Sequence, residues 1–208
     1  MKKNIHIIYQ VVFAALALFG VIVEVVIRAG ISKGANMLSY FTIQSNLIIA
    51  ATYILNMVIS GKNVQWMSAL KSCALLWILI TGVVFHFMLS KFYKPEGIFA
   101  YSNFILHYVT PVGMLLNWLI FEEKGRFKYS FSIFWVLYPI LYVIISQFRA
   151  ILDGFYPYWF INPTKPYPDG AGSGLNVVII TAVLAVVFCV IGVILVFIDN
   201  RLKNKVVV

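Results

Sequence analysis

Thr42 and His107 are the side chains of this sequence that best fit a nucleophile and its base. Thr42 stands in the segment YFTIQSN at residues 40–46, and His107 stands in LHYVTP at residues 106–111. A threonine hydroxyl is a weak nucleophile unless a neighbouring base takes its proton, and an imidazole titrates near neutral pH. If the two side chains meet, they form a candidate catalytic pair in which His107 takes the proton of Thr42.

Further polar residues could complete such a site. Catalysis by such a pair also needs hydrogen-bond donors wherever negative charge develops on an oxygen. Five candidates for the substrate pocket or the oxyanion site are Gln44, Ser45, Asn46, Asn103 and Arg149. Four candidates for a supporting role are Glu24, His86, Tyr142 and Asp153. Among the supporting candidates, Glu24 or Asp153 is expected to orient the imidazole.

The spacing of these residues predicts which of them share a helix face. Thr42, Ser45 and Asn46 are three or four positions apart, so they lie on one face of a helix. Asn103 and His107, four positions apart, share a face of a second helix. Polar side chains on membrane-spanning helices turn toward one another or toward a wet cavity. We therefore expect these residues to line one polar cavity between the helices.

The composition places these helices in a membrane protein. The chain has 208 residues, of which 62% are hydrophobic and 11% are charged, and its mean hydropathy is +0.93. Soluble domains are about a quarter charged. Six stretches have the length and apolar character of a membrane span: residues 5–27, 38–60, 68–90, 100–121, 130–150 and 174–198. We predict an all-α integral membrane bundle of six transmembrane helices, forming a single domain over residues 1–208.

The longest connection, residues 151–173, contains GFYPYWFINPTKPYPDGAGSG from Gly154. Its Pro and Gly residues argue against a helix, and its Trp and Tyr residues are typical of an interfacial anchor. Ten of the 16 Lys and Arg residues lie on the side of the N-terminus. The positive-inside rule therefore predicts a multi-pass protein of the bacterial plasma membrane with both termini cytoplasmic. The 151–173 loop is then extracytoplasmic and is expected to fold over the bundle.

This topology places the unusual polar residues at one depth. They come from five helices and fall in the outer half of the membrane, whereas the inner half is expected to hold almost nothing comparable. A blind outer pocket would favour an enzyme or a receptor. A continuous polar route to the cytoplasmic side would favour a transporter instead.

Several classes of function are disfavoured by the sequence. The net charge of +9 is spread over short connections, which does not suit nucleic-acid binding. Cys73 and Cys189 lie far apart inside predicted spans, so no disulfide framework or thiol metal site is indicated. His86 and His107 lack the spacing of a metal site, and no metal or cofactor is expected. The basic N-terminus precedes an apolar stretch too long for a signal peptide, which indicates an uncleaved first span.

Two non-enzymatic alternatives remain open at this point. Thr42 could bond to its own helix, and Asn46 and Asn103 could tie helices together, which describes a scaffold with a dry, closed bundle. The same polar residues could instead bind a small molecule or relay protons in a transporter or sensor. Against transport, the sequence has no visible inverted repeat or pair of broken helices.

The three segments YFTIQSN, LHYVTP and YPYWFINP (residues 156–163) resemble a family of bacterial six-span membrane proteins of unassigned function. More distantly, the threonine at the head of the second span and the His-x-x-x-Pro pattern of the fourth are similar to the androgen-induced-gene and androgen-dependent TFPI-regulating proteins. Those six-span membrane hydrolases cleave fatty acid esters of hydroxy fatty acids with a threonine and a histidine. The resemblance implies that Thr42 is the nucleophile, His107 its partner, and a lipid-like acyl ester the substrate. The YPYWFINP loop has no counterpart in those hydrolases.

Overall fold

The computed structural model describes residues 2–31, 34–59 and 65–203. Every regular element in these ranges is helical. Six helical stretches are long and apolar enough to cross a membrane: Lys3–Ile27, Phe41–Val58, Gln65–Leu89, Ile98–Phe121, Tyr129–Asp153 and Gly174–Leu202. The predicted all-α class with six helices of membrane length is therefore confirmed. Residue 60, the expected end of the second span, lies outside the described ranges.

These stretches are divided into α-helices and short segments of other helical pitch. The α-helices are α1 (Lys2–Ile22), α2 (Arg28–Ile31), α3 (Phe41–Val58), α4 (Gln65–Val84), α5 (Ile98–Phe104), α6 (Thr110–Phe121), α7 (Ser132–Asp153) and α8 (Gly174–Leu202). Three π-helical segments continue or join them: Val23–Ile27 after α1, Phe85–Leu89 after α4, and Ile105–Val109 between α5 and α6. None of the three was expected from the sequence, and π segments are rare outside functional or strained positions.

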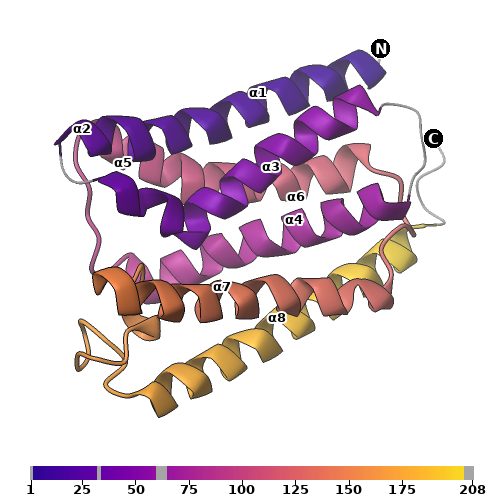
Figure 1. Ribbon diagram of the computed structural model, residues 1–208. Coiled ribbons are helices and arrows are strands. Elements are labelled where there is room, and N and C mark those ends of the chain that lie inside the picture. The colour runs from indigo at the N-terminus through magenta and orange to yellow at the C-terminus, as the bar shows by residue number, and fades with distance from the viewer. Residues whose placement is uncertain (1, 32–33, 60–64, 204–208) are drawn as a thin grey trace.

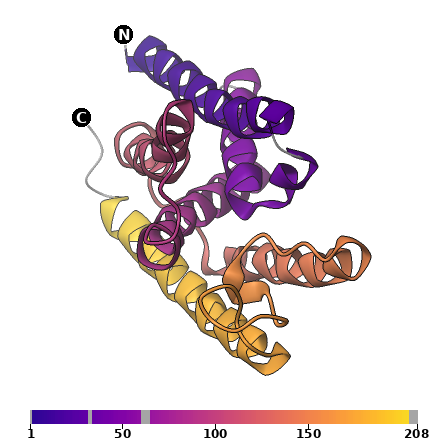
Figure 2. The same ribbon diagram turned by 90° about the vertical axis from the view of Figure 1, so that its left-hand side faces the viewer.

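The helices run back and forth in one bundle (Figure 1). α1 packs on α3 and α6, while α4 contacts α3, α6, α7 and α8. The start of α1 and the end of α8 lie at one end, here called the terminal end (Figure 1). Residues 154–173 lie at the opposite end, here called the loop end, beside α7 and α8 (Figure 2).

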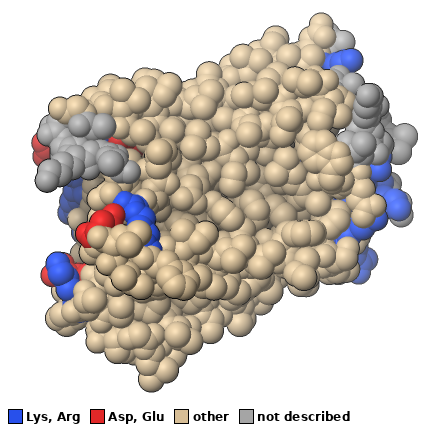
Figure 3. Space-filling view, in the orientation of Figure 1, with Lys and Arg blue, Asp and Glu red and all other residues tan. Residues whose placement is uncertain are grey.

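The outer surface of the bundle is apolar between two charged ends. On the face shown in Figure 3, Lys, Arg, Asp and Glu gather at the terminal end and the loop end. Helices α7 and α8 bury the smallest shares of their apolar windows, 22% and 17%, and they expose large side chains such as Phe148 and Val186. Soluble proteins rarely expose continuous apolar surface of this kind. These features suggest a multi-pass membrane protein.

A proline in α7 is compensated by a tryptophan of α4. Pro139 has no N–H, so the carbonyl of Trp135 one turn earlier loses its usual partner. The indole N–H of Trp77 donates to that carbonyl at 3.1 Å. The ring of Trp135 in turn lies against Gly192 of α8, where an added Cβ would stand 2.3 Å from the ring. This contact joins α4, α7 and α8.

Some helix ends differ from the sequence expectation. The second span begins at Phe41 rather than 38, because Tyr40 has an extended backbone (φ −77°, ψ 131°). Helix α7 continues to Asp153, so the loop begins at Gly154 rather than 151. Gly154 ends the helix in the left-handed conformation (φ 70°), which glycine adopts without strain. Helix α8 extends to Leu202 rather than 198.

A buried carboxylate fixes the connection between α6 and α7 onto α8. Asp199 is fully buried and accepts hydrogen bonds from the indole N–H of Trp118 (3.1 Å) and from the backbone N–H of Phe127 (2.9 Å). The ammonium of Lys124 donates to the carbonyls of Trp118 (2.6 Å) and Glu122 (2.8 Å) at the end of α6. A lysine in this position satisfies helix carbonyls that have no backbone partner.

Replacing Asp199 with alanine is expected to destabilise the bundle, because the change leaves two buried donors without acceptors. Each such donor costs roughly 1–3 kcal/mol. The midpoint of thermal unfolding in detergent, followed by tryptophan fluorescence, measures the loss. The matched control is Asn200→Ala, since Asn200 is the exposed neighbour and should change stability by no more than about 0.5 kcal/mol. Equal midpoints for the two variants would contradict the role given to Asp199.

Candidate functional site

Thr42 and His107 meet at the loop end of the bundle. Thr42 is the second residue of α3, and His107 lies in the π-helical segment between α5 and α6. The Thr42 Oγ1 and His107 Nε2 atoms are 3.1 Å apart. Thr42 is 7% exposed, and His107 is half-buried. The two side chains that the sequence singled out are thus within hydrogen-bond distance.

The backbone fixes which nitrogen of His107 carries a proton. The Nδ1 atom lies 2.9 Å from the carbonyl oxygen of Asn103, one turn earlier in the same helix. A carbonyl only accepts, so Nδ1 must be the donor. In the neutral imidazole Nε2 then holds a lone pair, and the Thr42 hydroxyl donates to it. The ring is also stacked on Phe85, with centroids 3.8 Å apart.

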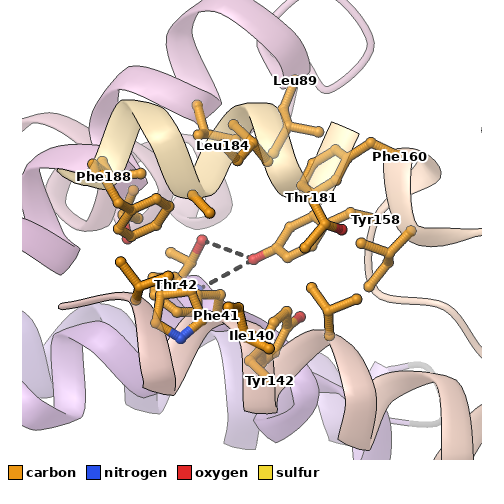
Figure 4. A pocket seen from close by; sticks show the side chains of 18 residues that line it. Phe41, Thr42, Leu89, Ile140, Tyr142, Tyr158, Phe160, Thr181, Leu184 and Phe188 are labelled. Atoms are coloured by element: carbon orange, nitrogen blue, oxygen red, sulfur yellow. Dashed lines mark hydrogen bonds between the residues drawn. The ribbon is translucent and has the colours of Figure 1, made fainter. Parts of the chain in front are cut away.

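Tyr158 from the 154–173 loop completes the contact, and the sequence did not single it out. Its hydroxyl oxygen accepts the backbone N–H of Thr42 at 3.2 Å and lies 3.3 Å from Thr42 Oγ1. Because the one hydroxyl proton of Thr42 goes to His107, the Tyr158 hydroxyl is the donor in the second contact. Burial raises the pKa of Tyr158 to about 12, which keeps the phenol protonated at neutral pH. Figure 4 shows the phenol pointing at Thr42.

Pro111 explains why the backbone beside His107 leaves the α-helical pattern. The N–H of Thr110 donates to the carbonyl of Ile105, five residues earlier, rather than to Leu106. Pro111 has no N–H, so it cannot serve the Leu106 carbonyl either. That carbonyl therefore needs a partner from outside its own backbone, because an unpaired buried carbonyl is costly.

Asn46 supplies this partner and ties α3 to the π-helical segment. Its amide Nδ2 donates to the carbonyls of Leu106 (3.1 Å) and Thr42 (2.9 Å). Its Oδ1 accepts the Thr110 hydroxyl at 2.6 Å. Asn46 is fully buried, and these bonds occupy both ends of its amide. It therefore holds the backbones of Thr42 and His107 in register, and it does not line either cavity described below.

Helix α4 braces the pair from the other side. The Ser45 hydroxyl lies 3.1 Å from the Thr42 carbonyl and 3.0 Å from the Thr81 hydroxyl. Gly82 packs against the backbone of His107, where an added Cβ would stand 2.9 Å from the His107 carbonyl oxygen. Ser45 is therefore a structural tie between α3 and α4 in this arrangement.

Other residues from the sequence analysis lie away from the Thr42 hydroxyl. The Gln44 amide donates to the Leu38 carbonyl (3.0 Å) and accepts the Tyr138 hydroxyl (2.6 Å). Tyr142 lines the smaller cavity described below, but its hydroxyl donates to the Ser39 carbonyl at 2.9 Å.

Arg149, Asp153 and His86 also form hydrogen bonds away from Thr42. Arg149 bonds to Asn36 and to Asp153 (2.9 Å), and Asp153 also accepts the N–H of Phe155. His86 is exposed and faces the Tyr108 hydroxyl at 3.2 Å. Neither Arg149 nor His86 lines a cavity with Thr42.

Glu24 lies near the site but does not orient His107. Its carboxylate accepts Arg28 Nε at 2.7 Å and the Ser102 hydroxyl at 2.5 Å. The expected orienting role of Glu24 or Asp153 is therefore corrected: the Asn103 backbone carbonyl holds the imidazole. Glu24 and Arg28 instead line the wall of the larger cavity.

Two cavities meet at Thr42. The larger, of about 280 Å³, is lined by Glu24, Arg28, Tyr40, Tyr93, Asn103 and His107 among others. The smaller, of about 70 Å³, lies between α3, α4, α7 and α8 and is mainly apolar. Thr42, Leu89 and Tyr158 line both cavities. A molecule bound at Thr42 therefore has room on two sides.

Asn103 lines the larger cavity, and its backbone carbonyl holds His107. Its Oδ1 atom is buried and has no hydrogen-bond partner within the described part of the chain. A water-sized molecule in the cavity does not reach this oxygen, so Oδ1 is not a contact for a bound molecule in this arrangement.

A second polar cluster lies at the terminal end, which corrects the expectation that this half is almost free of such residues. His6 Nε2 lies 3.0 Å from both Asn117 Oδ1 and Gln10 Nε2. Lys71 and Asn117 donate to Glu122, at 2.6 and 3.2 Å. Of these side chains, those of His6, Gln10, Lys71 and Glu122 border a cavity of about 270 Å³. The sequence did not predict this cluster, because polar and charged residues are common near the ends of membrane spans.

Buried apolar side chains separate the two polar clusters. Midway along α1, α3 and α6 stand Ala14, Ile49 and Met114, each at most 5% exposed and all in one hydrophobic core. Leu75 and Ile78 of α4 belong to the same core and are fully buried. This layer favours two separate cavities over a polar passage.

No group of three or more His, Cys, Asp and Glu side chains in the described ranges is arranged to hold a metal ion. Comparison of the chain with protein-family models, curated proteins and solved structures finds no match. The proposals below therefore depend on the geometry of the site and on the resemblance of its short segments.

The proton on His107 can be located directly, because the chain contains only three histidines. In protein labelled with ¹⁵N-histidine, we expect His107 at neutral pH to show the neutral tautomer with the proton on Nδ1. Thr42→Val should keep this tautomer, since Asn103 determines it, but should shift the Nε2 resonance. His86, which is exposed, provides the reference for a solvated ring. A proton on Nε2 of His107 would reverse the hydrogen-bond direction and exclude it as the base for Thr42.

Proposed function

We propose that this chain is a membrane-embedded hydrolase of lipid-like acyl esters, with Thr42 as nucleophile and His107 as general base. The observation that carries the proposal is the direction of the hydrogen bonds: Tyr158 donates to Thr42, Thr42 to His107, and His107 to a backbone carbonyl. A hydroxyl that donates to an imidazole lone pair is arranged to lose its proton during attack. The distant similarity of Thr42 at the head of the second span, and of the His-x-x-x-Pro pattern at His107, to the membrane hydrolases supports the same assignment.

In the first step, Thr42 Oγ1 attacks the ester carbonyl carbon while its proton passes to His107 Nε2. Negative charge then develops on the former carbonyl oxygen. The Tyr158 hydroxyl and the Thr42 backbone N–H are the donors nearest to that position. The Thr42 N–H belongs to the first turn of α3, whose positive end favours an anion. These groups take the oxyanion role that was predicted for Gln44, Asn46, Asn103 or Arg149.

In the second step, the bond from the carbonyl carbon to the ester oxygen breaks, and His107 Nε2 returns its proton to the departing alcohol. The acyl group remains on Thr42. A water molecule then attacks this acyl-threonine with His107 again as base, which releases the acid and restores the Thr42 hydroxyl.

The site would lie near the outer surface of the bacterial plasma membrane, with both termini in the cytoplasm. Lysine and arginine are more numerous in the connections of the terminal end, which supports this orientation. The ester would enter from the outer leaflet. The apolar layer between the two polar clusters argues against the alternative of transport. A receptor or sensor would not need a hydroxyl aimed at an imidazole lone pair.

Replacing Thr42 with alanine or His107 with glutamine is expected to reduce hydrolysis of p-nitrophenyl butyrate to the buffer rate, because each change removes one partner of the proton transfer. Tyr158→Phe removes one oxyanion donor and should lower kcat by about 10²- to 10³-fold. Purified protein in detergent or nanodiscs provides the measurement.

The matched controls are a second threonine of α3 and a histidine outside the site. Thr52→Ala removes a buried threonine of α3 that bonds only to its own helix, and His86→Ala removes the exposed histidine after α4. Both should retain the wild-type rate. If Thr42→Ala and His107→Gln fold normally and hydrolyse the ester as well as these controls, the pair is structural and the protein is not this hydrolase.

The proposed orientation can be tested with single cysteines on a background in which Cys73 and Cys189 are replaced by alanine. Asp169→Cys places a thiol on the exposed loop, and Glu123→Cys places one at the terminal end. A membrane-impermeant maleimide added to intact spheroplasts should label the first and not the second. Labelling of both should follow permeabilisation. The reverse pattern would place the candidate site on the cytoplasmic side.

A further inference from the structure

We propose that the smaller cavity, between α7 and α8, is the binding site for the acyl chain of the ester, and that the larger cavity takes the alcohol part. This assignment rests on the proposed hydrolysis at Thr42. The sequence predicted a single polar cavity lined by all of these residues. It did not predict two separate cavities on the two sides of Thr42.

The chemistry of the two walls separates the two parts of an ester. The smaller cavity is lined by apolar side chains of two helices: Leu184 and Phe188 of α8, and Ile140 and Val143 of α7. Figure 4 shows these two helices on either side of the space that ends at Thr42. An alkyl chain gains most where it meets only apolar walls, with a gain in binding of about fourfold for each buried methylene.

The larger cavity suits the alcohol part better. Its wall is also largely apolar, but it includes the Glu24–Arg28 ion pair and His107. An alkyl chain against these groups would cover them without offering hydrogen bonds, which is costly. An alcohol, with a hydroxyl to donate, fits this side.

The volume of the smaller cavity limits how much of the chain it can enclose. Roughly 10–15 Å³ is the least volume that holds one water-sized group, so a cavity of about 70 Å³ encloses only the first few methylenes of an acyl chain. We therefore expect kcat/KM to rise with acyl length over these first methylenes and then to level off. Carbons beyond that point would leave the enclosed space past Ile140, which is 37% exposed.

Two alanines of α8 provide the test. Ala185 lines the smaller cavity, whereas Ala182 is exposed on the outside of the same helix. Measured with p-nitrophenyl esters from acetate to decanoate, Ala185→Phe should lower kcat/KM for hexanoate and octanoate at least tenfold and change acetate less than twofold. Ala182→Phe should reproduce the wild-type profile. An equal fall for all esters, or an unchanged octanoate rate, in Ala185→Phe overturns the assignment.

A binding measurement separates this assignment from the proposed hydrolysis. Octanoic acid with a terminal diazirine, photolysed with the Thr42→Ala variant, should label the cavity-facing residues of α7 and α8. The label should be lost when Ala185→Phe is added and kept with Ala182→Phe. Such labelling without any ester hydrolysis by the wild type would contradict the hydrolase alone. Hydrolysis that depends on Thr42, with labelling unaffected by Ala185→Phe, would contradict the acyl site alone.

Discussion

The hydrogen bond from His107 Nδ1 to the Asn103 carbonyl is the interaction on which the candidate site depends. A carboxylate beside Nδ1 could accept the Nδ1 proton entirely, but the backbone carbonyl of Asn103 cannot. The neutral imidazole therefore keeps its proton on Nδ1. This tautomer leaves Nε2 as an acceptor, which directs the hydroxyl of Thr42 toward it. That direction leaves Thr42 Oγ1 free to accept from Tyr158. One backbone group thus determines the sense of three successive hydrogen bonds contributed by two helices and a loop.

This geometry requires a stretch of helix that departs from the α-helical pattern. Carbonyls released by proline must find donors inside the bundle, because lipid offers none. At Pro111 the donor is the amide of Asn46, and the same bond fixes α3 against the segment that carries the histidine. At Pro139 the donor is the indole of Trp77, and there the result is only packing of α4 against α7. The need to pair a carbonyl released by proline therefore only packs two helices together at Pro139. At Pro111 the same need positions the side chains of the proposed catalytic pair.

The spans could be predicted from hydropathy, and the meeting of Thr42 and His107 from the helical repeat. Gln44 was expected in the same pocket, but it is two positions from Thr42 and points to another face, toward Tyr138. Tyr158 could not be predicted. It is one of several aromatic residues in a loop, and its contact spans 116 positions of the chain. The π-helical segment beside His107 could not be predicted for a related reason: its Leu106 carbonyl is satisfied by Asn46 of another helix, which no local pattern reveals.

The 154–173 loop is part of the wall of the site, which bears on how an ester reaches it. The amide of Gln147 donates to the Ile161 carbonyl at 2.6 Å, and the indole of Trp159 donates to the Met88 carbonyl at 3.3 Å. Phe160 and Ile161 are buried against α4, α7 and α8. Opening this loop as a lid would break these bonds and expose apolar side chains, so it is costly. Entry between helices costs less, because the side chains that must move there are apolar and already face outward. In the proposed hydrolysis, an acyl chain that arrives from the side of α7 and α8 would meet Thr42 beside the phenol of Tyr158.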